Sequence, residues 1–236
     1  MAEWLEWARG PVFRACFLIM ALGLIRVLAL TVVAAYKLAR RSRENGRTIP
    51  WGEIIIATIK WLLPVKRGLQ GRGLFSLTSM VFHVAIIVTP IFLGAHIMLW
   101  ERGLGISWPA IGNLAADYLT LIAIVAGLAL FVERLASRDS RSISRAQDFL
   151  LPLLIVIPFA SGYLAMHPAL NPFGYDGTMF VHVMSGNLLF LVMPFTKISH
   201  VALFPATQLV SEIGWHLQPG AGRQVAVALG KEDEPL

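Results

Sequence analysis

Five long apolar runs dominate this sequence and limit what it can fold into. Each is close to or longer than the ~20 residues that a helix needs to cross the ~30 Å of hydrocarbon in a bilayer. In residue numbers, the runs are 11–36, 75–100, 113–132, 149–166 and 178–200. A mean hydropathy of +0.67 and a charged fraction of 14% exclude an ordinary soluble domain. The sequence therefore predicts an all-α membrane protein with five transmembrane helices in one bundle.

The distribution of basic residues predicts the orientation of this bundle. Lys and Arg concentrate in 37–72 and 133–148, which follow the first and third runs. The positive-inside rule places such loops in the cytoplasm, so we expect the N-terminus outside and the C-terminus cytoplasmic. The net charge of +6 then reflects membrane topology and not nucleic-acid binding. We divide the chain into a transmembrane domain, 1–204, and a cytoplasmic tail, 205–236.

A shorter apolar segment lies between the first two runs. Residues 51–63 include Glu53 and Lys60, so this segment is too short and too polar to span a bilayer comfortably. We predict that it forms a helix lying on the membrane surface.

Four histidines lie within two of the apolar runs. His182 and His200 are 18 residues apart, which is five whole turns and ~27 Å on an ideal helix. Antiparallel helices would then pair His96 with His182 near the outer face and His83 with His200 near the inner face. Because haem iron takes two axial ligands and imidazole supplies them, the pattern predicts two bis-histidine haems.

The spacing on the second run requires an interruption of the helix. His83 and His96 are 13 residues apart, which leaves them ~140° out of phase on an ideal helix. Pro90 lies between them and can kink the helix. Without a kink or two differently placed haems, one of these histidines is not a ligand, so a single haem remains an alternative.

The single cysteine, Cys16, limits which redox cofactors this chain can carry. One cysteine provides neither a CxxCH haem attachment nor the ligands of an iron–sulfur cluster. Any haem is therefore expected to be non-covalent haem b, and any iron–sulfur centre is expected on another chain.

The four histidines and the residues beside them resemble the gamma-subunit family of respiratory nitrate reductase, a membrane dihaem cytochrome b. They are also similar to the cytochrome subunits of dissimilatory sulfite-reduction and heterodisulfide-reductase-like membrane complexes. The likeness is carried by Phe82-His83, Gly94-Ala95-His96, and His182 with His200. The resemblance implies quinol oxidation near the outer face, two haems b and a cytoplasmic iron–sulfur partner subunit. It also implies the cytoplasmic membrane of a bacterium or archaeon.

Four other residues are candidates for this chemistry. Oxidising a quinol releases protons, and Asp117 and His167 are candidate bases at the outer side. Arg26 and Lys197 are candidates for binding haem propionates. Simpler roles remain open for each: a helix cap for Asp117, a loop position for His167, a structural ion pair for Arg26 and snorkelling for Lys197.

Two other classes of function remain open. A proton-relaying transporter would use the intramembrane histidines and Asp117, and its haem content would be zero. A purely structural membrane anchor would use the histidines as interhelical hydrogen-bonding groups. A monohaem quinone-reactive membrane anchor is a further alternative. In a purely structural anchor, replacing His182 or His200 would leave quinol oxidation intact.

Overall fold

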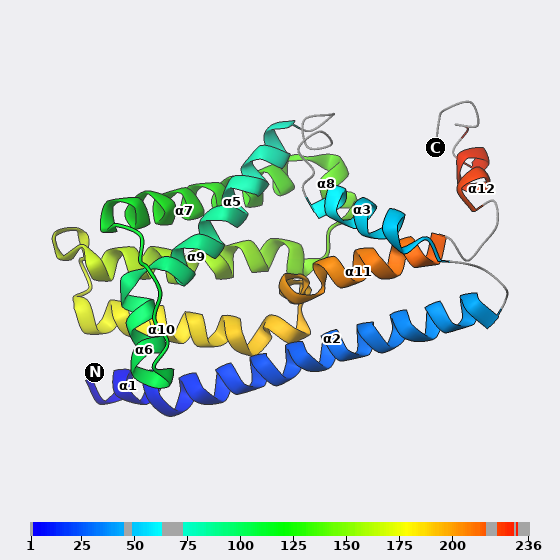
Figure 1. The fold of residues 1–236 in the computed structure, drawn as a ribbon. Helices are drawn as coiled ribbons and strands as arrows, with labels where there is room; N and C mark the ends of the chain where they lie inside the picture. Colours follow the sequence, from blue (N-terminus) through cyan, green and yellow to red (C-terminus); the bar gives the residue numbers. More distant parts are fainter. Residues whose placement is uncertain (1, 45–48, 63–72, 216–220, 229, 231–236) are drawn as a thin grey trace. The chain divides into compact units, whose positions relative to one another are not determined.

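The computed structural model describes residues 2–44, 49–62, 73–215, 221–228 and 230, and its regular elements there are all helical (Figure 1). Five helices in these residues are long and apolar enough to cross a membrane. They are Ala2–Arg41, Gly73–Phe92, Asn113–Ala136, Ala146–Met166 and Tyr175–Phe195. This confirms the predicted class and the five candidate spans, whereas the orientation in the membrane stays a prediction.

The chain divides into two compact units. The first contains residues 1–20 and 65–196, and the second contains residues 21–64 and 197–236. The boundary near residue 20 falls inside the long helix α2 (Phe13–Glu44). The predicted division into a membrane domain, 1–204, and a tail, 205–236, describes which residues lie in the bilayer, so it stays a prediction.

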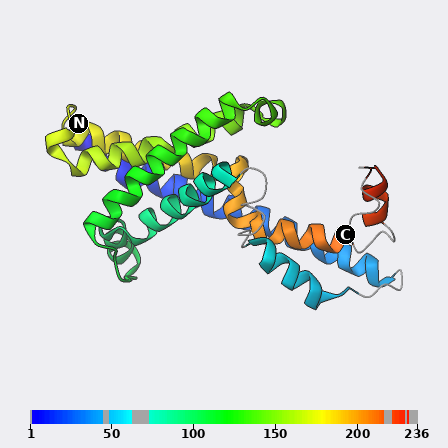
Figure 2. The same cartoon turned by 90° about the horizontal axis from the view of Figure 1, so that it is seen from above.

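Four helices form the body of the first unit. They are α5 (Gly73–Phe92), α7 (Asn113–Ala136), α9 (Ala146–Met166) and α10 (Tyr175–Val192). Each packs on the next in chain order, and α9 and α10 lie side by side in both views (Figures 1 and 2). Between α7 and α9 the chain forms the short helix α8 (Arg138–Ile143), and η2 (Pro168–Leu170) follows α9.

Small residues allow these helices to approach closely. The buried positions of α7 are Ala116, Ala123, Ala126 and Gly127. Lipid tails are as apolar as leucine, so membrane helices associate through close packing at such residues. A Cβ at Gly127 would lie 2.7 Å from Cγ2 of Val156 on α9 and 3.0 Å from Cε2 of Phe82 on α5. Gly127 therefore marks the point where α5, α7 and α9 meet.

The N-terminal segment packs against α10. It consists of α1 (Ala2–Trp7), the π-helical turn η1 (Ala8–Val12) and the start of α2. Pro11 lacks an N–H and lies within η1, where the turn is widened. The side-chain amide of Asn187, which is 2% exposed, donates to the carbonyl of Ala8 at 3.0 Å. Aromatic rings of Phe13, Phe17 and Phe190 extend this contact.

The predicted continuous helix from 178 to 200 is wrong. α10 ends at Val192 and is followed by the short 3-10 turns η3 (Met193–Phe195) and η4 (Lys197–Ser199) before α11 (His200–Trp215). Pro194 cannot donate a backbone hydrogen bond, and Thr196 is extended, with φ −123° and ψ 178°. The five-turn relation between His182 and His200 therefore does not exist, and the fifth candidate span ends before His200.

The second apolar run is also divided. α5 ends at Phe92, Leu93 is extended with φ −71° and ψ 124°, and a separate helix α6 (Gly94–Leu104) follows. His83 therefore lies on α5 and His96 on α6. This division replaces the single kinked helix that Pro90 suggested.

The second unit pairs α3 (Trp51–Leu62) with α11, and it also contains α12 (Ala221–Ala228). Ile54 of α3 and Ile213 of α11, each 1% exposed, are its largest fully buried side chains. The segment predicted between the first two spans is thus helical from Trp51 to Leu62, and residue 63 lies outside the described residues. Its position on a membrane surface stays a prediction.

The contact at Gly127 predicts a selective effect on stability. Gly127→Ala should lower the free energy of unfolding in detergent by about 1–3 kcal/mol, because the added methyl group overpacks three helices. Gly186→Ala on α10 is the matched control, since a Cβ there meets nothing within 4 Å. Its unfolding free energy should change by less than ~1 kcal/mol. Equal losses in the two variants would contradict this packing account.

Candidate functional site

The first unit brings His96 and His182 together. His96 comes from α6 and His182 from the second turn of α10, and both side chains are partly buried. Their ring centroids are 6.1 Å apart, and the ring planes are inclined by 18°. This is the meeting that antiparallel pairing predicts for the outer couple; the role of the two rings as ligands stays a prediction.

Both rings use the same nitrogen to contact the backbone. Nδ1 of His96 lies 3.0 Å from the carbonyl oxygen of Pro90, and Nδ1 of His182 lies 2.8 Å from that of Pro158. A carbonyl oxygen only accepts hydrogen bonds, so Nδ1 carries the proton in each ring. Each Nε2 then has a lone pair. Metal-binding histidines commonly have this arrangement, in which the second nitrogen donates to a carbonyl.

The break between α5 and α6 explains how His96 reaches this position. Helix α5 ends at Phe92, and its last carbonyls have no donor within the helix. The His96 imidazole donates to one of them, that of Pro90, six residues earlier in the chain. His96 lies outside the candidate spans, and burial lowers its pKa, an effect that the hydrogen bond to Pro90 opposes. Burial thus favours the neutral ring, which is the form that binds metals.

Gly162 makes the space that His182 occupies. A Cβ at this position of α9 would lie 2.9 Å from both Cε1 and Nδ1 of the His182 ring. Sequence reasoning did not identify Gly162. The available signal was a glycine within an apolar helix, one turn after Pro158, where a glycine usually has a packing or functional reason.

Arg9 is another residue near this couple that sequence reasoning did not identify. Arg9, on η1, is the cation whose charge acts on the His182 ring, and its carboxylate neighbour is Glu6 at 3.9 Å. The predicted propionate partners, Arg26 and Lys197, belong to the second unit, and both are exposed. Arg26 is therefore not buried between helices, and the propionate role of both residues stays a prediction.

His83 belongs to the first unit and His200 to the second. Nδ1 of His83 lies 2.7 Å from the carbonyl oxygen of Ser79, and Nδ1 of His200 lies 2.6 Å from that of Lys197. Each ring thus resembles those of the outer couple in the nitrogen that contacts the backbone. The inner couple stays a prediction.

Asp117 and His167, the two candidate bases, are in contact. Oδ2 of Asp117 on α7 lies 3.4 Å from Nε2 of His167, which follows the end of α9. Nδ1 of His167 lies 2.8 Å from the carbonyl oxygen of Tyr163, and the two rings stack at 4.0 Å. Asp117 is the fifth residue of α7, whose N-cap is Gly112, so it does not cap its helix.

This contact has consequences for protons. The Tyr163 carbonyl accepts the Nδ1–H of His167, which leaves Nε2 as the basic nitrogen of the ring. Nε2 then faces a carboxylate oxygen, and a hydrogen bond between these two acceptors requires a proton on one of them. The side chains of Asp117 and His167 are 37% and 29% exposed, so neither is enclosed by the helices.

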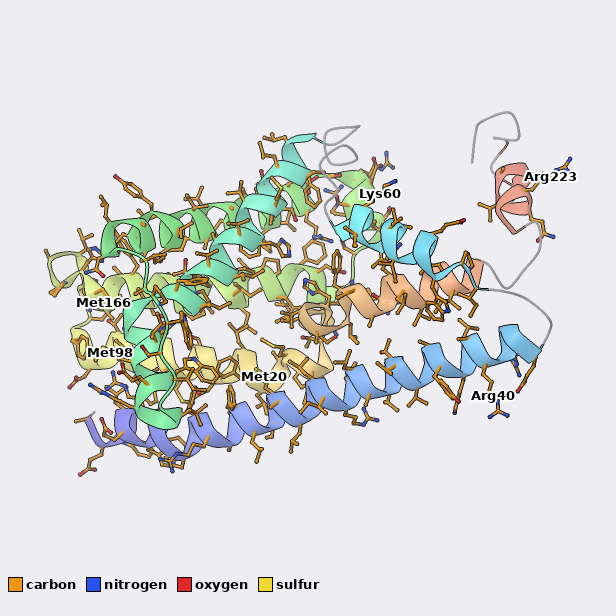
Figure 3. All side chains as sticks on the ribbon, viewed as in Figure 1. Met20, Arg40, Lys60, Met98, Met166 and Arg223 are labelled. Atoms are coloured by element: carbon orange, nitrogen blue, oxygen red, sulfur yellow. The ribbon has the colours of Figure 1, made fainter. Side chains whose placement is uncertain are left out.

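The histidine couple and this acid–base pair lie at one end of the first unit. Met98 on α6 and Met166 at the end of α9 mark that end in Figure 3. The basic segment around α8 lies at the other end of α7, because Arg134 is 17 residues, or ~26 Å, beyond Asp117.

Comparisons with known proteins identify a relative of this chain, but the relative has no known function. No protein-family description matches this chain, and no solved structure matches it. An uncharacterised protein of Nitratidesulfovibrio vulgaris strain Hildenborough is 29% identical over 197 residues, which cover 83% of this chain and 86% of the relative. The likeness therefore extends over most of both chains.

The space at Gly162 predicts a local effect on one histidine. In Gly162→Ala the His182 ring should move away from Pro158, and its Nδ1 resonance should shift in solid-state ¹⁵N NMR of histidine-labelled protein. Gly177→Ala on α10 is the control, because a Cβ there meets nothing within 4 Å. An unchanged His182 resonance in Gly162→Ala would show that the ring does not occupy this space.

Proposed function

We propose that this protein is a membrane cytochrome b subunit. It lies in the cytoplasmic membrane of a bacterium or archaeon, where it oxidises quinol and passes electrons through two b-type haems to a cytoplasmic iron–sulfur partner subunit. The observation that carries the proposal is the His96–His182 couple, in which both Nδ1 atoms are bound to carbonyls and both Nε2 atoms have lone pairs.

The spacing of the couple suits one metal between two rings. A metal–imidazole bond is about 2 Å long and the ring centre lies about 1 Å behind the nitrogen, so two opposed ligands have centroids roughly 6 Å apart. The observed separation is 6.1 Å. No group of three or more His, Cys, Asp or Glu side chains in the described part of the chain is arranged to hold a metal. Haem needs only two such ligands, because its ring supplies the other four donors.

The residues of the first unit would therefore hold the outer haem. His96 and His182 would bind its iron, the carbonyls of Pro90 and Pro158 orient the two rings, and Gly162 leaves room for the second ring. A bound haem b supplies one-electron redox chemistry. The inner haem rests on His83 and His200 and on the resemblance, so a count of haems tests it separately.

Asp117 and His167 provide the proton acceptor for the same reaction. Oxidation of a quinol to a quinone releases two protons and two electrons. The pair takes up the two protons one after the other, each on Nε2 of His167 or on the Asp117 carboxylate that faces it, and releases each one on its exposed side. The two electrons leave one at a time toward the outer haem. The Tyr163 ring stacked on His167 adds an apolar surface beside the base.

The Asp117–His167 pair also favours a second candidate, a proton-relaying membrane transporter. Ionisable groups at membrane depth are functional sites by default, and this pair can exchange a proton without any haem. The two candidates differ in their content of haem. A purified protein that lacks haem but relays protons would support the transporter.

Haem content tests the main proposal. Wild-type protein should show the dithionite-reduced spectrum of haem b and two haems per chain. His96→Ala and His182→Ala should each lose one haem, because neither remaining ring can bind the iron on both sides. His167→Ala is the matched control and should retain both. Absence of haem b bands from the wild-type protein would refute the proposal.

Rates of haem reduction test the proton acceptor. Asp117→Asn and His167→Gln should slow haem reduction by a quinol analogue about 10²-fold or more, since general bases contribute on this scale. Their haem content and their reduction by dithionite should stay at wild-type levels. Asp139→Asn, an exposed change on α8, should match the wild type. Wild-type rates in both site variants would exclude this pair as the base.

A further inference from the structure

The broken end of α5 is satisfied by donors from the chain that follows it. A helix leaves its last four carbonyls without intrahelical donors, and buried carbonyls need partners. Here each of the last four has one. The donors are Leu93 N to Thr89 at 2.9 Å, His96 Nδ1 to Pro90 at 3.0 Å, Trp108 Nε1 to Ile91 at 2.9 Å, and Ile111 N to Phe92 at 3.0 Å.

Two of these donors come from the loop between α6 and α7. α6 ends at Leu104, and Gly105 follows with φ +70°, the left-handed conformation that glycine adopts at helix ends. The loop then returns to the end of α5, where Trp108 and Ile111 donate. Trp108 is partly buried, and its ring lies against Trp100 of α6, with centroids 6.2 Å apart.

The acceptors of Trp108 and His96 are adjacent peptide carbonyls. Trp108 binds the carbonyl of Ile91, and His96 binds that of Pro90. The two peptide planes are separated only by φ and ψ of Ile91. This residue is the second-last of α5, so both angles are helical and the neighbouring carbonyls do not reorient independently. Movement of the Ile91 carbonyl therefore moves the acceptor that orients the His96 ring.

We propose that Trp108 is a positioning residue for His96. Its indole N–H holds the end of α5 so that the Pro90 carbonyl fixes the His96 ring at its angle to His182. This inference rests on the proposed haem function, in which His96 is an axial ligand. Trp108 itself touches neither the metal site nor the quinol.

The position of His96 affects the redox properties of its haem. A hydrogen bond from Nδ1 to a carbonyl makes the imidazole more basic, and a more basic ligand stabilises the oxidised, more positive iron. Loss of the Trp108 hydrogen bond should loosen the contact between Pro90 and His96. The midpoint potential of the outer haem should therefore rise, and its low-spin EPR signal should change as the ring planes lose their alignment.

The test compares substitutions at two tryptophans, Trp108 and Trp100. Trp108→Phe removes the N–H and keeps an aromatic ring, and Trp108→Met is a second variant that removes the N–H and keeps a large apolar side chain. Trp100→Phe is the matched control, because Trp100 belongs to the same ring cluster and meets Trp108 and Phe17 through its ring. The Trp108 variants should keep two haems, raise the midpoint potential of one and alter one EPR signal, whereas the control should match the wild type.

The results separate this inference from the function on which it rests. Wild-type potentials and EPR signals in the Trp108 variants would overturn it, and so would equal shifts in Trp100→Phe, which would indicate packing instead of the hydrogen bond. A wild-type protein without haem would refute the proposed function alone. In that protein the His96 Nδ1 resonance in ¹⁵N NMR still tests Trp108, because the variants should shift it and the control should not.

Discussion

Hydrogen bonds from imidazole to backbone carbonyl determine the chemistry that this bundle can perform. An unpaired N–H is costly where water is excluded, so each buried histidine ring must find an acceptor in the protein. His96 and His182 find theirs at Pro90 and Pro158. These two bonds set the tautomer of each ring and restrict its rotation, and the rings lie with their centroids 6.1 Å apart. A metal site at this position depends on all three.

Helix interruptions, more than helix periodicity, place the histidines. Counting residues on an ideal helix made the His182–His200 pair look well aligned and made His96 look out of phase. Both conclusions assumed unbroken helices. The chain stops being helical near Pro194 and at Leu93, so His200 is removed from the helix of His182 and His96 is turned toward it. The sequence showed the prolines, but it could not show which backbone dihedrals they would leave.

The sequence predicted correctly the features that depend on the hydropathy of the chain and on the thickness of a bilayer. Helix class, five candidate spans and the meeting of His96 with His182 follow from the length of apolar runs and from antiparallel order. Gly162 and Trp108 could not be found in this way, because their roles are distances to His182 and to the carbonyl of Ile91. Such distances depend on packing between segments that lie far apart in the chain.

The loop between α6 and α7 links the electron and proton sides of the proposed reaction. Its Trp108 holds the end of α5 beside the carbonyl that orients His96. The same loop leads into α7, whose fifth residue is Asp117. One short segment therefore contributes to the placement of both sites. The side chains of Asp117 and His167 are 37% and 29% exposed, so the proposed proton acceptor is open on one side, as a base that must release each proton again requires.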